Sequence, residues 1–236
     1  MIVGNRAFVT NYCKMGLIWD FSNEREEEMK NNGRTPVAVF DFDGTIISGD
    51  SFLPFMRYVV GDWEYYLGMF FLLPWLGGYA FGVIDNRKIK EKVIGRFLKD
   101  KPILDIRALG KSYVESFLHT KEKPKMMAKI DEHLKENHVL LLASASLLVY
   151  LEPWAEINQF DGVCGAKLEV DLEGLITGRI CGNNGFGQEK LDAVTEWLAE
   201  RNPERTYAYG DSQGDKELLD WADVKTFKGR LVSLDE

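Results

Sequence analysis

Four short segments carry side chains that could do chemistry together, and the first of them holds two carboxylates. Asp41 and Asp43 follow an apolar run, and Gly44 comes directly after them. Two carboxylates in one small site can take different roles, one ionised as a nucleophile or metal ligand and the other carrying a proton as general acid and base. An isolated Asp-x-Asp pair is more often a turn that caps a helix, so the chemical interpretation needs support from the other segments.

The other three segments supply a hydroxyl, an amine and two more carboxylates. Ser144 follows an apolar run and can bind an anion, as can the amides after it, or cap a helix. Lys190 lies near the start of an expected helix, where the macrodipole disfavours a cation, so a functional lysine competes with a solvated one. Asp211 and Asp215 offer the oxygen ligands that Mg²⁺ takes, or they cap a turn.

Taken together, these segments fit phosphoryl transfer. An attacked phosphate is an anion and repels a bare carboxylate, and a divalent cation together with Lys190 would offset that repulsion. A carboxylate nucleophile would then form an aspartyl-phosphate, which divides one difficult step into two. The second carboxylate would protonate the leaving alkoxide and afterwards activate water.

Three apolar runs are expected to position these side chains as parallel strands, because each is rich in β-formers and ends in small or acidic residues. Ligands of open parallel α/β sheets bind outside the carboxyl ends of the strands. The sequence therefore predicts an α/β protein with a Rossmann-like parallel sheet. The strands are expected at Val37–Phe40, Val139–Ala143 and Thr206–Tyr209, helices at Glu189–Arg201 and Lys216–Trp221, and a hairpin at Ala166–Val170 and Leu175–Ile180.

The chain between the first two strands is long and has a helical pattern with no convincing strand. A crossover between parallel strands needs far fewer than the roughly 85 residues found here. We therefore expect an all-helical cap at 51–136, inserted into a core made of 36–50 and 137–236. Residues 1–35 are expected to be an N-terminal extension, either a solvated helix or a flexible lead-in.

The order and spacing of these motifs resemble those of the haloacid dehalogenase (HAD) superfamily of phosphatases. The likeness runs from about Pro36 to Phe227 and rests on DFDGT at 41–45, Ser144, Lys190 and GDSQGD at 210–215. The helical insert resembles the cap of subfamily I. The stretches at 144–155 and 177–194 look most like subfamily IB, the phosphoserine-phosphatase-like group, and within it like phosphatases of the phosphatidylglycerophosphatase C type.

The resemblance implies a Mg²⁺-dependent phosphatase and a role for each matching residue. Asp43 also favours phosphate hydrolysis over dehalogenation, because members of the superfamily that cleave carbon–halogen bonds lack an acid at that position. A phosphotransferase and a non-catalytic binding protein with the same fold stay open as alternatives. The implied roles are Asp41 as nucleophile and metal ligand, Asp43 as general acid/base that also offers its backbone carbonyl to the metal, Thr45, Ser144, Ala145 and Lys190 as phosphate-binding residues, and Asp211 and Asp215 as metal ligands.

The expected cap contains a stretch of twenty uncharged residues, 65–84, that bears on the substrate. A single membrane span is excluded, because it would place the first motif and the other three on opposite sides of the bilayer. A helical hairpin in the membrane interface and a buried cap core stay open. Lipid contact would favour a phosphorylated lipid headgroup such as phosphatidylglycerophosphate, and a buried core a small soluble phosphomonoester such as phosphoserine. Arg57, Arg87 and Lys88 are either headgroup contacts or solvated residues.

Composition sets the outer limits of these hypotheses. The 236 residues carry 29 basic and 37 acidic side chains, a net charge of −8, so a nucleic-acid partner is not expected. Three widely spaced cysteines fit a reducing compartment. We therefore expect a cytoplasmic protein, with membrane association through 65–84 left open.

Overall fold

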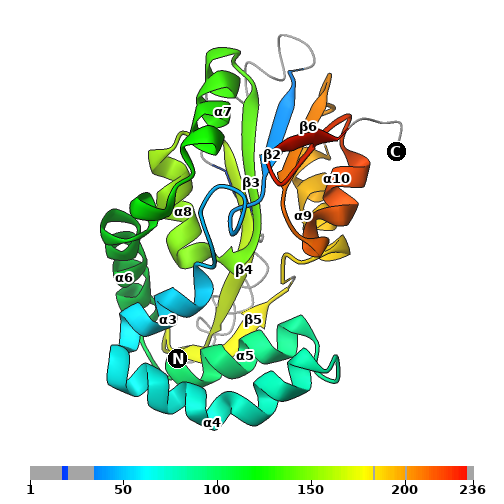
Figure 1. The fold of residues 1–236 in the computed structure, drawn as a ribbon. Coiled ribbons are helices and arrows are strands. Elements are labelled where there is room, and N and C mark those ends of the chain that lie inside the picture. Colours follow the sequence, from blue (N-terminus) through cyan, green and yellow to red (C-terminus); the bar gives the residue numbers. More distant parts are fainter. Residues whose placement is uncertain (1–17, 21–34, 183, 200, 233–236) are drawn as a thin grey trace.

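The structure, a computed structural model, describes residues 18–20, 35–182, 184–199 and 201–232 (Figure 1). Almost all of the expected N-terminal extension, 1–35, lies outside these residues. Within them the strands form one eight-stranded sheet in the order β1-β4-β3-β2-β6-β7-β8, with β5 paired to β4. The strands are β1 (Ile18–Asp20), β2 (Val37–Phe40), β3 (Val139–Leu147), β4 (Gly162–Val170), β5 (Ile176–Cys181), β6 (Thr206–Gly210), β7 (Val224–Phe227) and β8 (Arg230–Val232).

The middle of the sheet is parallel, as the sequence predicts. β2 lies between β3 and β6, with Val37 opposite both Val139 and Thr206. The pairs β3–β4 and β6–β7 are also parallel, whereas β1, β5 and β8 join antiparallel. The carboxyl ends of β2, β3 and β6 therefore meet at one edge.

Helices cover both faces of this sheet because its central strands are apolar on both sides. Ala38 and Phe40 contribute to one buried cluster, and Val37 and Val39 to the other. α7 and α8 lie on one side of the strands and α9 and α10 on the other (Figure 1). The bounds are α7 (Pro124–Lys135), α8 (Leu148–Ile157), α9 (Gln188–Leu198), η2 (Gln213–Asp215) and α10 (Lys216–Trp221).

Every regular element described between β2 and β3 is a helix, in agreement with the expected all-helical insertion. α3 to α5 lie at the end of the molecule beyond the carboxyl ends of the strands (Figure 1). α7 instead packs against β3 of the sheet, so the division into cap and core at 51–136 stays a prediction. The remaining bounds are α3 (Phe52–Val60), α4 (Asp62–Ala80), α5 (Asn86–Phe97), α6 (Ile103–Ser116) and η1 (Leu118–Lys121).

The apolar stretch 65–84 is neither a buried cap core nor a helical hairpin, and both of these expectations were wrong. It belongs to one continuous helix, α4, which passes through Pro74 and ends at Ala80 before a turn. Only Gly68 and Leu72 of this helix are buried. The physical reason is that α4 is apolar on all sides but contacts its neighbours α3 and α5 along one side, so its other side chains have nothing to pack against.

The helices of the described residues include none that is both long and apolar enough to cross a bilayer.

Several parts of the sheet differ from the sequence prediction. β3 continues to Leu147, four residues beyond the predicted end at Ala143, with a shift of register against β4 between these two positions. Ser144 and Ala145 therefore lie in an irregular part of the strand and not after it. The β7–β8 pair was not predicted at all, whereas the predicted hairpin is confirmed as β4 and β5.

Candidate active site

The turn that follows β2 places Asp41 and Asp43 at the carboxyl edge of the sheet. Asp41 is buried, and its backbone amide donates to the carbonyl oxygen of Tyr209 at 2.9 Å, which continues the pairing of β2 with β6. Gly44 then adopts a φ of +78°, and a Cβ atom at this position would lie 2.2 Å from a carboxylate oxygen of Asp211. The first and last motifs therefore touch at a point where only glycine fits.

Lys190, near the start of α9, joins two carboxylates of the site. Its side chain is only 3% exposed, and its Nζ atom lies 2.7 Å from Asp41 Oδ1 and 2.5 Å from Asp215 Oδ1. Burial by itself would lower the pKa of this amine, but the two carboxylates outweigh it and raise the pKa. Lys190 therefore stays charged beside Asp41 and can offset negative charge there.

Asp43 points to a different set of partners. Its Oδ1 atom accepts a hydrogen bond of 2.8 Å from the backbone amide of Ser51, and its Oδ2 atom accepts one from the hydroxyl of Ser146. Burial, with a smaller contribution from Asp50, raises its pKa to about 7. This carboxyl can exchange a proton near neutral pH, which a general acid and base must do.

Burial also raises the pKa of Asp41, to about 6, although Lys190 pulls it down. The pKa of Asp215 lies below its ordinary value, because Lys190 and the hydroxyl and amide of Ser212 outweigh the cost of burial. Asp215 is therefore the most firmly ionised of these carboxyls, and Asp43 the one most ready to carry a proton.

Asp41, Asp211 and Asp215 form an acidic cluster whose carboxylate oxygens lie within 4.8 Å of one another. Three hard oxygen donors at this spacing fit a divalent cation such as Mg²⁺. The carboxylate of Asp43 is not part of this cluster, because Ser51 and Ser146 hold it. A metal contact from Asp43 through its backbone carbonyl stays a prediction.

A pocket of about 530 Å³ brings most of the predicted site residues together. Its lining combines polar groups with apolar side chains from α3, α4 and α5. Asp215 does not line this pocket but pairs with Lys190, which does. Thr45 borders a neighbouring pocket, and its hydroxyl lies 3.4 Å from Asp211 Oδ1. The predicted residues that line the main pocket are Asp41, Asp43, Ser144, Ala145, Lys190 and Asp211.

The three basic residues considered as headgroup contacts do not border this pocket. Arg57 pairs with Asp62 at 2.7 Å on the surface, and Lys88 pairs with Asp85 at 2.9 Å. Arg87 donates to the carbonyl oxygens of Ile180 and Gly182 and so joins α5 to β5. In this structure the contacts of these three residues are therefore those of surface or structural residues.

Sequence reasoning missed several polar residues of the pocket, among them Ser146 and Lys90. Ser146 donates to Asp43 from a position two residues after Ser144, a spacing that places both on one side of a strand. Lys90 of α5 reaches the pocket from the helical insertion. Its place in the charged run NRKIKEK makes it look like a solvated lysine, so only the tertiary fold identifies it.

Comparison with known proteins agrees with this geometry. The family model for haloacid dehalogenase-like hydrolases matches residues 38–220. Protein CicA of Caulobacter vibrioides is 31% identical over 199 residues, which are 83% of this chain and 87% of that protein. Histidinol-phosphatase of Neisseria meningitidis is 22% identical, with coverage of 78% and 85%.

Solved structures share the fold at low identity. A Bordetella pertussis protein described as having unknown function has a TM-score of 0.72 and 20% identity, covering 82% of this chain and 89% of that one. A substrate-bound phosphoserine phosphatase has a TM-score of 0.60 and 16% identity, covering 84% and 87%. With the family model matching most of the chain and the acidic motifs gathered around one pocket, the chain belongs to the haloacid dehalogenase-like hydrolases and is a phosphatase of that family.

Proposed function

We propose that this protein is a Mg²⁺-dependent phosphomonoester hydrolase that forms an aspartyl-phosphate on Asp41 and acts on a phosphorylated lipid headgroup such as phosphatidylglycerophosphate. The observation that carries the catalytic part is the convergence of Asp41, Asp43, Ser144, Lys190 and Asp211 on one pocket. These residues come from segments up to 170 residues apart in the chain (211 minus 41), and each has the chemistry that phosphoryl transfer needs.

The first half of the reaction uses Asp41 as nucleophile and Asp43 as acid. A carboxylate oxygen of Asp41 attacks phosphorus, and the bond from phosphorus to the alkoxide oxygen breaks. The carboxyl of Asp43, with its pKa near 7, gives its proton to that oxygen, and the alcohol leaves. Lys190 and the Ser144 segment hold the phosphoryl oxygens in place.

The second half releases phosphate and restores the enzyme. A water molecule attacks phosphorus, and the Asp43 carboxylate takes its proton. The bond from phosphorus to Asp41 breaks, so inorganic phosphate and the free carboxylate are formed. Bound at Asp41, Asp211 and Asp215, Mg²⁺ would supply the positive charge that offsets repulsion between the Asp41 carboxylate and the phosphoryl oxygens.

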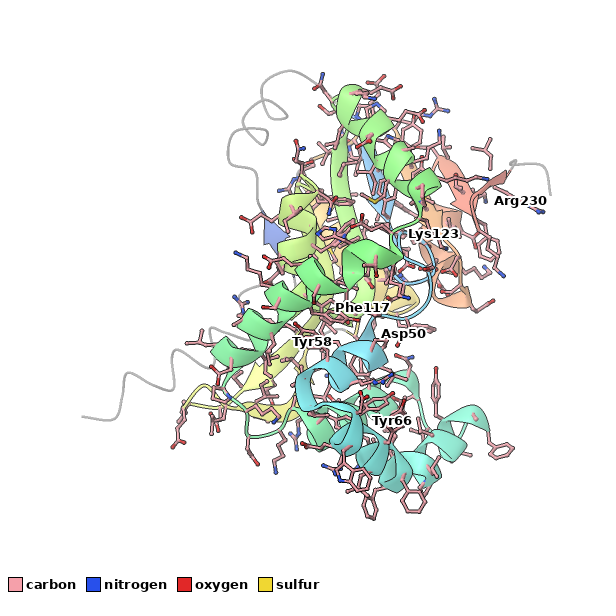
Figure 2. The ribbon with its side chains drawn as sticks, turned by 60° about the vertical axis from the view of Figure 1, so that its left-hand side comes forward. Asp50, Tyr58, Tyr66, Phe117, Lys123 and Arg230 are labelled. Atoms are coloured by element: carbon pink, nitrogen blue, oxygen red, sulfur yellow. The ribbon has the colours of Figure 1, made fainter. Side chains whose placement is uncertain are left out.

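The lipid part of the proposal rests on the surface of α4. Large apolar side chains stand exposed along this helix, among them Trp63 at 82%, Phe70 at 65% and Phe71 at 62% exposure. Figure 2 shows Tyr66 and neighbouring rings of α4 at the end of the molecule remote from Lys123 and Arg230. An apolar surface of this kind marks a site of contact with a membrane or another protein.

Two further observations favour a lipid surface as the partner of α4. A basic side chain lies against one of its rings, with Lys92 Nζ 4.2 Å from the ring centre of Trp75. Such a cation suits anionic headgroups. Leu76 and Tyr79 of the same helix line the catalytic pocket, so a headgroup held at this surface would lie close to Asp41.

A small soluble phosphomonoester is the second candidate substrate. It is favoured by relatives whose names specify soluble compounds, phosphoserine and histidinol phosphate. Transfer of the phosphoryl group to an alcohol shares the first half-reaction, and product analysis with an added alcohol acceptor separates it from hydrolysis.

Release of inorganic phosphate by wild type and Asp41→Asn, with Mg²⁺ or with EDTA, tests the catalytic proposal. We expect EDTA to abolish turnover and the variant to lose at least roughly a thousandfold in kcat, because its side chain cannot attack phosphorus. Asp105→Asn, an exposed carboxylate on α6, is the matched control and should retain wild-type turnover. Equal turnover by Asp41→Asn would remove the proposed nucleophile.

A further inference from the structure

The pocket contains a second buried lysine, Lys90 of α5, whose contacts are unlike those of Lys190. Lys90 is only 7% exposed, and its Nζ atom donates to the carbonyl oxygen of Ala145 at 2.6 Å and to Asn184 Oδ1 at 2.7 Å. Both acceptors are neutral. The ion pairs identified among the described residues include none with Lys90.

A buried ammonium group without a carboxylate partner is costly, because neutral acceptors compensate only in part for the loss of hydration. Burial accordingly lowers the pKa of Lys90 to about 8, despite favourable interactions with Asp43 and Asp50. The ammonium has three N–H donors, and two of them are accounted for by Ala145 and Asn184. One donor is left for a ligand. The charge interacts with the carboxylates of Asp43 and Asp50 and lies 5.9 Å from the ring centre of Phe52, but no ion pair or hydrogen bond to an anionic group is identified for it among the described residues.

The position of Lys90 indicates which ligand that is. It borders the same pocket as Asp41, Ser144 and Lys190 but enters from the helical insertion, on the side of Phe52 and Ile89. Lys190 is already paired with two carboxylates at the nucleophile. Lys190 of the core therefore supplies the positive charge next to the transferred phosphoryl group. Lys90 is placed to contact a different part of the substrate.

A purely structural role explains less of this arrangement. Asn184 also donates to Asn86 Oδ1 at 2.7 Å, one helical turn before Lys90, so α5 is already tied to the loop before α9. A neutral donor at position 90 would strengthen that tie without the cost of burying a charge. The positive charge of the buried Lys90 ammonium group therefore indicates an anionic ligand.

We propose that Lys90 binds a second anionic group of the substrate, a carboxylate or a phosphodiester joined to the phosphomonoester by a short chain. This inference rests on the proposed phosphomonoesterase function and narrows its substrate class. A phosphorylated lipid headgroup supplies the phosphodiester and a soluble acid supplies the carboxylate, so the same site serves either source.

Matched substrates test the proposal. 2-Carboxyethyl phosphate and propyl phosphate differ only in the carboxylate, and glycerophosphoglycerol phosphate offers a phosphodiester without acyl chains. For Lys90→Met we expect kcat/KM to fall roughly 10- to 100-fold on one or both of the substrates with a second anion, mainly through KM, and to stay within about threefold of wild type on propyl phosphate. The substrate with the larger fall identifies the anionic group.

Two further variants separate recognition from folding. Lys90→Arg keeps the charge and should restore part of the preference for the second anion. Lys88→Met, on an exposed lysine of the same helix that pairs with Asp85, should behave as wild type. An equal loss of activity on all three substrates would overturn the proposal, because it would show that Lys90 has a structural role or contacts the phosphoryl group itself. No loss on any substrate would overturn it too, because Lys90 would then contact no part of the substrate.

A binding measurement covers the case in which none of the three esters is hydrolysed, which would count against the proposed function alone. Titration calorimetry would compare butylphosphonate with two non-hydrolysable phosphonates of similar length, 3-carboxypropylphosphonate and a phosphonate that carries a phosphodiester in place of the carboxylate. We expect wild type, and not Lys90→Met, to bind at least one of these two at least roughly tenfold more tightly than butylphosphonate. Equal affinities of wild type for all three phosphonates would overturn the inference independently of turnover.

Discussion

At the scale of single residues, the environments of the two carboxylates of the first motif separate their roles. Asp41 faces the cation of Lys190, whereas Asp43 faces a hydroxyl and an amide. Neutral donors stabilise a buried carboxylate less than a cation does. Asp43 therefore holds its proton to higher pH than Asp41 does, and this difference suits Asp43 to the acid–base role proposed for it.

The raised pKa of Asp43 predicts how stability depends on pH. The folded-state pKa, about 7, lies above the unfolded value, so the folded state binds more protons between about pH 4 and 7. Stability contributed by this group is therefore lost as pH rises through that window. Asp43→Asn removes the titration, and in EDTA we expect it to gain about 4 kcal/mol relative to wild type between pH 4 and pH 8.

Urea unfolding of both proteins at pH 4, 6 and 8 measures that gain. Asp171→Asn, in the exposed turn between β4 and β5, supplies the control for removal of a carboxylate. A stability difference between Asp43→Asn and wild type that stays constant across the three pH values would contradict the raised pKa.

The same residues show where sequence reasoning about the site stops. Acid, hydroxyl and lysine positions were recognisable because each follows an apolar strand or begins a helix. Lys90 was not, because its neighbours in the chain are charged and its burial depends on Ala145 and Asn184, which lie 55 and 94 positions away. Burial of a polar side chain is a property of the tertiary fold, and local pattern does not report it.

At the scale of elements, the tight turn after β2 determines how the acidic cluster is assembled. Gly44 lies between the strand that ends at Phe40 and the carboxylate of Asp211. A side chain there would push Asp211 away and also strain a backbone with positive φ. The turn therefore links the sequence of the first motif to the geometry of the proposed metal ligands.

Gly44→Ala should raise the Mg²⁺ concentration for half-maximal activity at least roughly tenfold, because displacement of Asp211 weakens a proposed ligand of the cation. Gly61→Ala is the matched control: its φ is also +78°, but nothing lies within 4 Å of an added Cβ atom. We expect both variants to lose about 1 kcal/mol of stability from backbone strain, and only the first to need more Mg²⁺. The same Mg²⁺ requirement in both would show that the contact with Asp211 does not matter.

Elements with a strong local pattern were predicted well, and those that depend on neighbours were not. β2, β6 and α10 have short apolar or amphipathic patterns and lie where the sequence places them, apart from one added residue at the end of β6. The strands β7 and β8 have only four and three residues, too few for a clear local pattern, and the pair forms because β6 offers an edge for pairing. The apolar length of α4 fits a buried core or an interfacial hairpin equally well in the sequence, and the outcome depends on its neighbours, which among the described elements are chiefly α3 and α5.

At the scale of the whole molecule, the exposed rings of α4 are expected to bind vesicles containing anionic lipid. The paired change Phe70→Glu and Phe71→Glu places charge on two of these rings, so wild type should float with such vesicles in a density gradient and the double variant should stay in the dense fraction. Leu104→Glu replaces an equally exposed apolar side chain on α6, 75% exposed, and should float like wild type.

The same vesicles distinguish the two candidate substrates, because α4 both carries the exposed rings and lines the pocket through Leu76 and Tyr79. If lipid is the partner, the double variant should lose activity on vesicle-borne phosphatidylglycerophosphate and keep it on propyl phosphate, which reaches the pocket from water. Wild type that stays in the dense fraction with anionic vesicles would rule out the lipid surface. The pocket, with Asp41 and Lys190 unchanged, would then serve a soluble phosphomonoester, and the rings of α4 would need a protein partner instead.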